Sequence, residues 1–158
     1  MGEIIGRGDN VMMGYLGRPD ETAEALKGGW IYTKDAGWMN DEGYIFITDR
    51  LKDMIVTGAE NVYSIEVENA LSYHPSILES AVIGLADEKW GERVHAIIVV
   101  DSSAGHPSAE ELRDHCRERI AGYKIPKSFE MRNELLPRSA AGKILKRQLR
   151  DEMLEGAC

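Results

Sequence analysis

Residues 49–68 of the chain read D-R-L-K-D-M-I-V-T-G-A-E-N-V-Y-S-I-E-V-E. Residues 54–56 are apolar and predict a short strand, and Gly58 follows as a turn residue. From Ser64 onward, small or apolar residues and one histidine recur at the i, i+3, i+4, i+7 spacing of one helix face. This stretch therefore predicts a strand, a turn and a helix over residues 64–73, and it marks a change in the chain's pattern.

Before this stretch, the sequence predicts a small β-rich region. Short strand-like runs at residues 3–7, 30–33, 37–39 and 44–48 alternate with glycine turns, and residues 19–26 predict one short helix. The turn N-D-E-G at residues 40–43 is typical of a hairpin connection. About 48 residues of short strands can hardly bury a core alone. We expect them to be the tail of a larger domain, either disordered or paired with a neighbouring molecule in a homo-oligomer.

After this stretch, strands and helices are mixed. Strands are predicted at residues 81–85, 94–101 and 128–131. Ser108 and Glu111 form a capping-box pattern, which predicts a helix to about residue 120. A last helix is predicted over residues 143–154, with Leu145, Leu149 and Met153 at four-residue steps. The fold class is therefore α+β: a short mixed or antiparallel sheet covered by helices, preceded by the β-rich remnant.

Composition excludes several classes of function. The net charge of −8 argues against non-specific nucleic-acid binding, which depends on many basic contacts to phosphate. No apolar run approaches the ~18 residues that a membrane-spanning helix needs, and the first residues lack the pattern of a secretory signal. The two cysteines, Cys116 and Cys158, do not form a disulfide framework. We therefore expect a cytoplasmic protein without a transmembrane segment.

Three motifs, in order, carry a family resemblance. They are G-W-I-Y-T-K-D-A-G-W at residues 29–38, the stretch at 49–68, and P-R-S-A-A-G-K-I-L-K-R-Q-L-R at residues 137–150. Together they resemble the C-terminal portion of the adenylate-forming enzymes, which include acyl-CoA synthetases. Residues 2–19 resemble the segment before these motifs. The resemblance implies that residues 1–49 end a large N-terminal AMP-binding domain and that residues 50–158 form the C-terminal lid domain.

The resemblance also implies an activity. The whole enzyme would activate a carboxylic acid, here a fatty acid, with ATP and Mg²⁺ to acyl-AMP and then transfer the acyl group to CoA. The sequence holds no glycine-rich phosphate loop and no acyl pocket region. We therefore expect the chain to be inactive alone and to need a missing N-terminal domain as its partner. The alternative is a freestanding, non-catalytic module that binds a nucleotide or CoA.

Lys143 matches the lysine that members of this family use for adenylation. A mobile ammonium can stabilise the charge that develops where the carboxylate meets the α-phosphate, and the Ser-Ala-Ala-Gly run before it predicts a mobile loop. The alternative is an ordinary solvated lysine. The nearby Lys146, Arg147 and Arg150 are expected to form the solvated face of the last helix.

The nucleotide contacts are implied in the same way. Asp35 matches an aspartate that accepts hydrogen bonds from both ribose hydroxyls, although Lys34 replaces the glycine common in the family, which puts the turn geometry in doubt. Arg50 matches an arginine on the ribose and phosphate side of AMP, and Lys52 stands at the hinge position. Without the resemblance, Asp35 would be a turn residue and Arg50 a surface ion-pair partner.

The CoA contacts follow from the resemblance as well. Gly58, Ala59 and Glu60 match the loop that lines the pantetheine tunnel, and Trp90 and Tyr123 match aromatic positions near the CoA nucleotide. An ordinary turn and ordinary packing are the alternatives for these residues. The histidines and cysteines show no metal-ligand spacing, so no metal site is expected.

Overall fold

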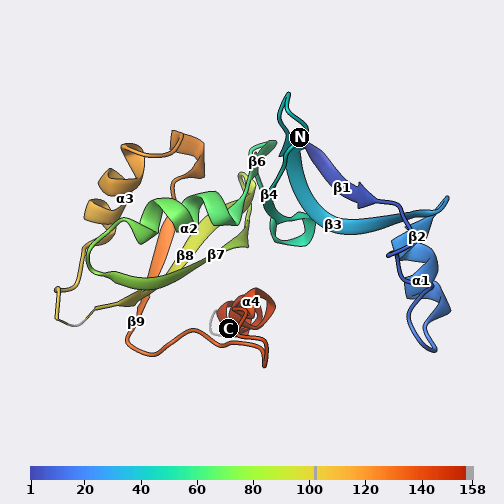
Figure 1. Ribbon diagram of the computed structural model, residues 1–158. Coiled ribbons are helices and arrows are strands. Elements are labelled where there is room, and N and C mark those ends of the chain that lie inside the picture. The colour runs from blue at the N-terminus through green and yellow to red at the C-terminus, as the bar shows by residue number, and fades with distance from the viewer. Residues whose placement is uncertain (102, 156–158) are drawn as a thin grey trace. The chain divides into compact units, whose positions relative to one another are not determined.

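A computed structural model describes residues 1–101 and 103–155, and it divides into two compact units, Met1–Lys52 and Asp53–Cys158 (Figure 1). The sequence predicted a division after residue 49, and the units meet three residues later, after Lys52. Cys158, which entered the cysteine argument, lies outside the described residues.

The first unit is built on a four-stranded antiparallel sheet in which β3 pairs with all three other strands. Its elements are β1 (Gly2–Gly6), α1 (Pro19–Ala25), β2 (Leu26–Lys27), β3 (Trp30–Met39) and β4 (Ile45–Arg50). The two strands predicted at residues 30–33 and 37–39 are one continuous strand, because β1 and β4 pair along its whole middle. The expectation of disorder was wrong, since the strands pair within the chain; pairing with a second molecule stays a prediction.

The turn between β3 and β4 confirms the predicted hairpin. The amide of Gly43 donates to the carbonyl of Asn40 at 3.0 Å, and Gly43 has a φ of 85°. The unit has little interior: among its described apolar residues only Ala25 and Ala36 are buried, while Trp38 and Phe46 stack with ring centroids 4.5 Å apart and stay partly exposed. A sheet of this size cannot bury a large core by itself.

The second unit contains a five-stranded mixed sheet in the order β6-β5-β8-β7, with β9 parallel to β8. Its strands are β5 (Ile55–Thr57), β6 (Glu60–Val62), β7 (Ile77–Asp87), β8 (Gly91–Val100) and β9 (Ser128–Arg132). Its helices are α2 (Ser64–Ser72), α3 (Ala109–Arg117) and α4 (Lys146–Glu155), with short 3₁₀ turns η1 (Leu51–Asp53), which begins in the first unit, and η2 (Gly122–Lys124). The parallel pair needs a crossover between β8 and β9, and α3 lies in it.

Helices cover both faces of this sheet. One apolar cluster joins α2 and α3 to one face, and a second joins α4 to the other (Figure 1). Along β8, Ala96 and Ile98 belong to the first cluster, whereas Ile97 and Val99 belong to the second. The predicted inner face of α2 is confirmed, since Val67, Ala70 and Leu71 are buried, and His74, which follows the end of the helix at Ser72, is buried as well. Coverage on both sides explains why β8 is buried almost throughout.

Three local outcomes matter for the site. Ser108 Oγ accepts from the amide of Glu111 at 3.1 Å, as the capping pattern predicted. The helix predicted from residue 143 begins only at Lys146, so Lys143 precedes it. Glu60, predicted in a loop, lies in β6.

Within residues 1–101 and 103–155, no helix has both the length and the apolar character needed to cross a membrane.

Candidate functional site

Asp35 and Arg50 are brought together by the pairing of β3 with β4. The two residues are direct partners in the strand register, and Arg50 Nε lies 2.7 Å from Asp35 Oδ1. Asp35 keeps 23% of its side-chain surface exposed and Arg50 51%, so both remain accessible to a ligand. The antiparallel register therefore creates a charged pair at the end of the hairpin from residues far apart in the sequence.

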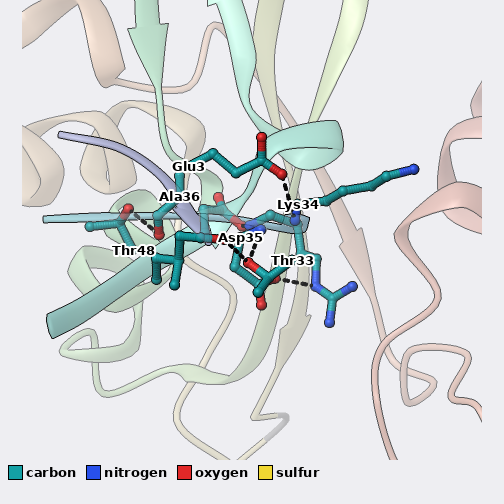
Figure 2. A network of polar contacts seen from close by, with 9 residues as sticks. Glu3, Thr33, Lys34, Asp35, Ala36 and Thr48 are labelled. Carbon is teal, nitrogen blue, oxygen red and sulfur yellow. Dashed lines mark hydrogen bonds and ion pairs between the residues drawn. The ribbon is translucent and has the colours of Figure 1, made fainter. Parts of the chain in front are cut away.

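Hydroxyl groups fix the backbone on both sides of Asp35, as Figure 2 shows. The amide of Asp35 donates to Thr33 Oγ1 at 3.1 Å, and the Thr33 hydroxyl donates to the carbonyl of Ile4 at 2.7 Å. The Thr48 hydroxyl donates to the carbonyl of Ala36 at 3.0 Å. These bonds tie β1, β3 and β4 together around one carboxylate.

Lys34 adopts a left-handed backbone conformation, which favours glycine. Its φ is 60°, in the left-handed region, which disfavours residues with a Cβ atom. Its amide donates to Glu3 Oε1 at 2.9 Å (Figure 2), and its ammonium lies 2.7 Å from Glu24 Oε1 on α1. The hydrogen bond and charge of Lys34 lower the pKa of Glu24, and those of Glu24 raise the pKa of Lys34. Two acidic side chains, Glu3 and Glu24, thus contact a lysine that stands in a left-handed backbone conformation.

An open cavity of about 280 Å³ lies beside this pair. Its lining includes Tyr15, Arg18, Tyr32, Lys34 and Arg50. A second hollow of about 410 Å³ is lined in part by Lys52, the last residue of the first unit. Both hollows are lined by Tyr32 and by charged groups of both signs, with Glu24 in each.

Lys143 is exposed at one end of a hydrogen-bonded turn. The amide of Ser139 donates to the carbonyl of Lys143 at 2.8 Å, and the amide of Gly142 donates to the carbonyl of Ser139 at 2.8 Å. Arg138 and Ile144 form the bridge at its base, and Gly142 takes a φ of 78°. The run that predicted a mobile loop is therefore a closed turn with the lysine at one end.

The prediction that Lys146 is solvated was wrong. Its side chain is only 16% exposed; its ammonium lies 2.7 Å from Glu68 Oε1 and donates to Ser64 Oγ at 2.5 Å. Arg147 is 92% exposed, as predicted, whereas Arg150 has a buried Nε that finds no hydrogen-bond partner among the described residues. The helix buries its first charged residue because α2 supplies a carboxylate for it.

Gly58 and Ala59 form the two-residue turn between β5 and β6. Both have positive φ, 59° and 67°, as the primed hairpin turns require. A Cβ atom on Gly58 would lie 2.8 Å from Trp90 Cε3, and the Gly58 amide donates to the Trp90 carbonyl at 2.9 Å. Lys89 Nζ lies 4.6 Å from the centroid of the exposed Trp90 ring. Four of the predicted CoA residues, the turn, Glu60 and Trp90, are thus close together.

Tyr123 stands apart from that group. It lies in η2, beside Lys124, whose ammonium is 2.6 Å from Glu66 Oε1 on α2. Across the two described stretches of chain, no hydrogen bond or ring contact joins Tyr123 to Trp90 or to the Gly58 turn. The same stretches contain no group of three histidine, cysteine, aspartate or glutamate residues that could hold a metal ion.

Comparison with known proteins connects this arrangement to a family. The family model of the AMP-binding enzyme C-terminal domain matches residues 66–143. A long-chain-fatty-acid–CoA ligase of Bacillus subtilis is 47% identical over 98% of this chain and 27% of its own length. A 2-succinylbenzoate–CoA ligase of Bacillus mycoides is 44% identical over 94% of the chain and 30% of its own length. The chain thus spans less than a third of these relatives.

A solved structure agrees in fold. The o-succinylbenzoate CoA synthetase of Bacillus subtilis, in complex with its acyl-adenylate intermediate, superposes with a TM-score of 0.88 and 42% identity, over 95% of this chain and 30% of that one. Identity at this level over nearly the whole chain reflects a shared family as well as a shared fold. The chain therefore belongs to the adenylate-forming enzymes and contains their C-terminal domain.

Proposed function

We propose that this chain carries the nucleotide-binding pair, the hinge and the adenylation lysine of an ATP-dependent fatty acid–CoA ligase. The observation that carries the proposal is the Asp35–Arg50 pair, joined at 2.7 Å beside an open cavity, in a member of the adenylate-forming enzymes. The pair offers a carboxylate for hydroxyl groups and a guanidinium for phosphate within one rigid hairpin.

The first half-reaction would join the acid to AMP. A carboxylate oxygen attacks the α-phosphorus of ATP, the new O–P bond forms, and the bond to the β-phosphate oxygen breaks, releasing pyrophosphate with its electron pair. Negative charge develops on the α-phosphoryl oxygens, and Mg²⁺ arrives with the ATP phosphates. Lys143 is exposed and its backbone belongs to a closed turn, which suits the stabilisation of that charge by its ammonium group.

The nucleotide would be held by the first unit. Asp35 has two acceptor oxygens for the two ribose hydroxyls, and the Asp35–Arg50 contact orients the guanidinium before a nucleotide arrives. Because the bonds from Thr33 and Thr48 fix the strands around Asp35, little ordering remains to be done on binding. Preorganisation of this kind favours a ligand that matches the pair.

The second half-reaction would transfer the acyl group. The CoA sulfur attacks the acyl carbonyl carbon, the C–S bond forms, the C–O bond to AMP breaks, and the thiol proton leaves to solvent. The Gly58 turn offers backbone without a side chain, and Trp90 offers an exposed ring for CoA. Lys52, the last residue of the first unit, is the proposed hinge for a change of orientation between the two half-reactions.

A chimera tests the proposal. The matching C-terminal part of the Bacillus subtilis long-chain-fatty-acid–CoA ligase would be replaced by this chain, and pyrophosphate and acyl-CoA would be measured with acids of several classes. We expect the chimera to form both products with a long-chain acid, and the isolated chain to form neither. A chimera that folds and binds ATP but releases no pyrophosphate would favour the alternative, a non-catalytic binding module.

A further inference from the structure

Two carboxylates contact the segments that come just before and just after the Lys143 turn in the sequence. Glu79, on β7, contacts Arg138 before the turn, and Glu68, on α2, contacts Lys146 after it. Neither glutamate was singled out from the sequence. Since Arg138 and Lys146 flank Lys143 closely in the chain, the position of the lysine depends on where these two carboxylates stand.

The contact through Glu79 reaches the residue next to Lys143. Glu79 Oε2 pairs with one terminal nitrogen of Arg138, and the other terminal nitrogen donates to the carbonyl of Gly142 at 2.8 Å. Glu79 Oε1 accepts from the amide of Leu136 at 2.7 Å. One planar guanidinium thus links a largely buried carboxylate to the peptide bond between Gly142 and Lys143, and its fixed fork of donors suits these two acceptors better than the compact ammonium of a lysine.

The contact through Glu68 holds the other side. Glu68 Oε1 lies 2.7 Å from the Lys146 ammonium and accepts from the amide of Val82 at 2.8 Å. The carboxylate is 14% exposed, so its charge is little screened by water. Lys146 is also the first residue of α4, where the helix dipole disfavours a cation. The ion pair with Glu68 therefore stabilises the start of α4, where the charge of Lys146 would otherwise be unfavourable.

We propose that Glu79, acting through Arg138, and Glu68, acting through Lys146, are positioning residues for the adenylation step. This inference rests on the proposed role of Lys143. Adenylation needs the ammonium at one place relative to the reacting phosphate, and small displacements of a catalytic group cost a large factor in rate. The two carboxylates set that place by fixing both ends of the turn to the sheet and to α2.

The first test uses the isolated chain and does not depend on activity. Glu79→Gln keeps the shape of the side chain and removes its charge, and amide hydrogen exchange at Gly142 would be followed by NMR. We expect exchange at Gly142 to rise at least about tenfold while the buried amides of β8 stay protected. Glu152→Gln is the matched control, because Glu152 pairs with Arg132 and anchors α4 away from the turn.

The second test uses the chimera. For Glu79→Gln and for Arg138→Lys, we expect kcat for acyl-adenylate formation to fall about tenfold to a hundredfold with KM for ATP unchanged. Conversion of supplied acyl-AMP and CoA to acyl-CoA should keep its rate. If Glu79→Gln does not fold, Arg138→Ala replaces it, since the Arg138 side chain is 44% exposed.

The outcomes separate this inference from the proposed function. Full adenylation in Glu79→Gln and Arg138→Lys, in a chimera that Lys143→Ala inactivates, would overturn the positioning role and leave the proposed function intact. If the chimera with Lys143→Ala forms acyl-adenylate as fast as the parent chimera, the proposed function fails. Unchanged exchange at Gly142 in Glu79→Gln would overturn the positioning role whichever result the activity gives.

Discussion

Asp35 and Arg50 face each other across β3 and β4, with 2.7 Å between Arg50 Nε and Asp35 Oδ1. The register of a single hairpin brings them together. The pairing that follows the turn at residues 40–43 shifts between Gly37 and Ala36, and beyond this irregularity Asp35 lies opposite Arg50. The proposed nucleotide contact is therefore a property of the hairpin and does not require the rest of an enzyme to form.

Removing the charge of Asp35 should weaken nucleotide binding. In the chimera, Asp35→Asn keeps the shape of the side chain but loses one acceptor oxygen and the ion pair with Arg50. Hydrogen bonds to charged groups contribute ~1.5–3 kcal/mol, so we expect KM for ATP to rise about tenfold to a hundredfold. Steady-state kinetics would check this. Asp41→Asn, on the exposed turn between β3 and β4, is the control and should leave KM unchanged.

Adding a methyl group to Gly58 should destabilise the second unit. The φ of 59° disfavours any Cβ atom, and that atom would also lie 2.8 Å from the Trp90 ring. The first effect costs roughly 1 kcal/mol, and crowding of the ring adds about 1 kcal/mol. Gly105→Ala separates the two effects, because Gly105 has a φ of 87° and open space around it. Urea unfolding would give both free energies, and equal losses would contradict the predicted contact.

Burial of His95 should make the second unit less stable in mild acid. His95 Nδ1 lies 2.8 Å from Ser128 Oγ, and its buried Nε2 has no partner among the described residues. Burial lowers the pKa of His95; the charge of Glu130 opposes this, and those of Arg93 and Arg132 add to it. Because the folded state binds the proton less well than the unfolded state, stability is complete above about pH 6.5 and falls as the pH drops below it.

A comparison of variants measures this effect. Urea midpoints would be determined at about pH 7.5 and about pH 5.5 for the parent chain and for His95→Gln. We expect the urea midpoint of the parent to fall more than that of His95→Gln when the pH is lowered from the higher value to the lower one. His106→Gln removes an exposed histidine and should behave like the parent. A parent whose midpoint changes no more than that of His95→Gln would refute the assignment.

Local patterns were enough to predict the elements that bury a regular face. Val67 and Leu71 repeat at helical spacing, and both are fully buried in α2. The cap at Ser108 depends on residues three apart and was predicted for the same reason. Strand β6 was missed because Glu60 and Asn61 are exposed and polar, and only pairing with β5 makes them a strand.

The candidate site could be predicted only in part from the sequence, because its contacts also depend on tertiary structure. The resemblance singled out Asp35, Arg50 and Lys143, but the contacts that hold them come from distant parts of the chain. The sequence predicted that Lys146 is exposed to solvent, because its neighbours in the chain are charged. Its burial depends on the ion pair with Glu68, which lies on α2, far earlier in the sequence. Glu79 gave no signal at all, because a single glutamate in a strand does not reveal the arginine that it will meet.

The proposed role of Lys143 in adenylation is tested most directly by measuring acyl-adenylate formation in the chimera that carries Lys143→Ala. Pyrophosphate release from ATP and a long-chain acid would be measured beside the conversion of supplied acyl-AMP and CoA to acyl-CoA, with Arg147→Ala as a control on the exposed side of α4. We expect Lys143→Ala to lose at least about a hundredfold in the rate of pyrophosphate release, while its thioester formation and both activities of the control stay unchanged. Pyrophosphate release within twofold of the parent would contradict it.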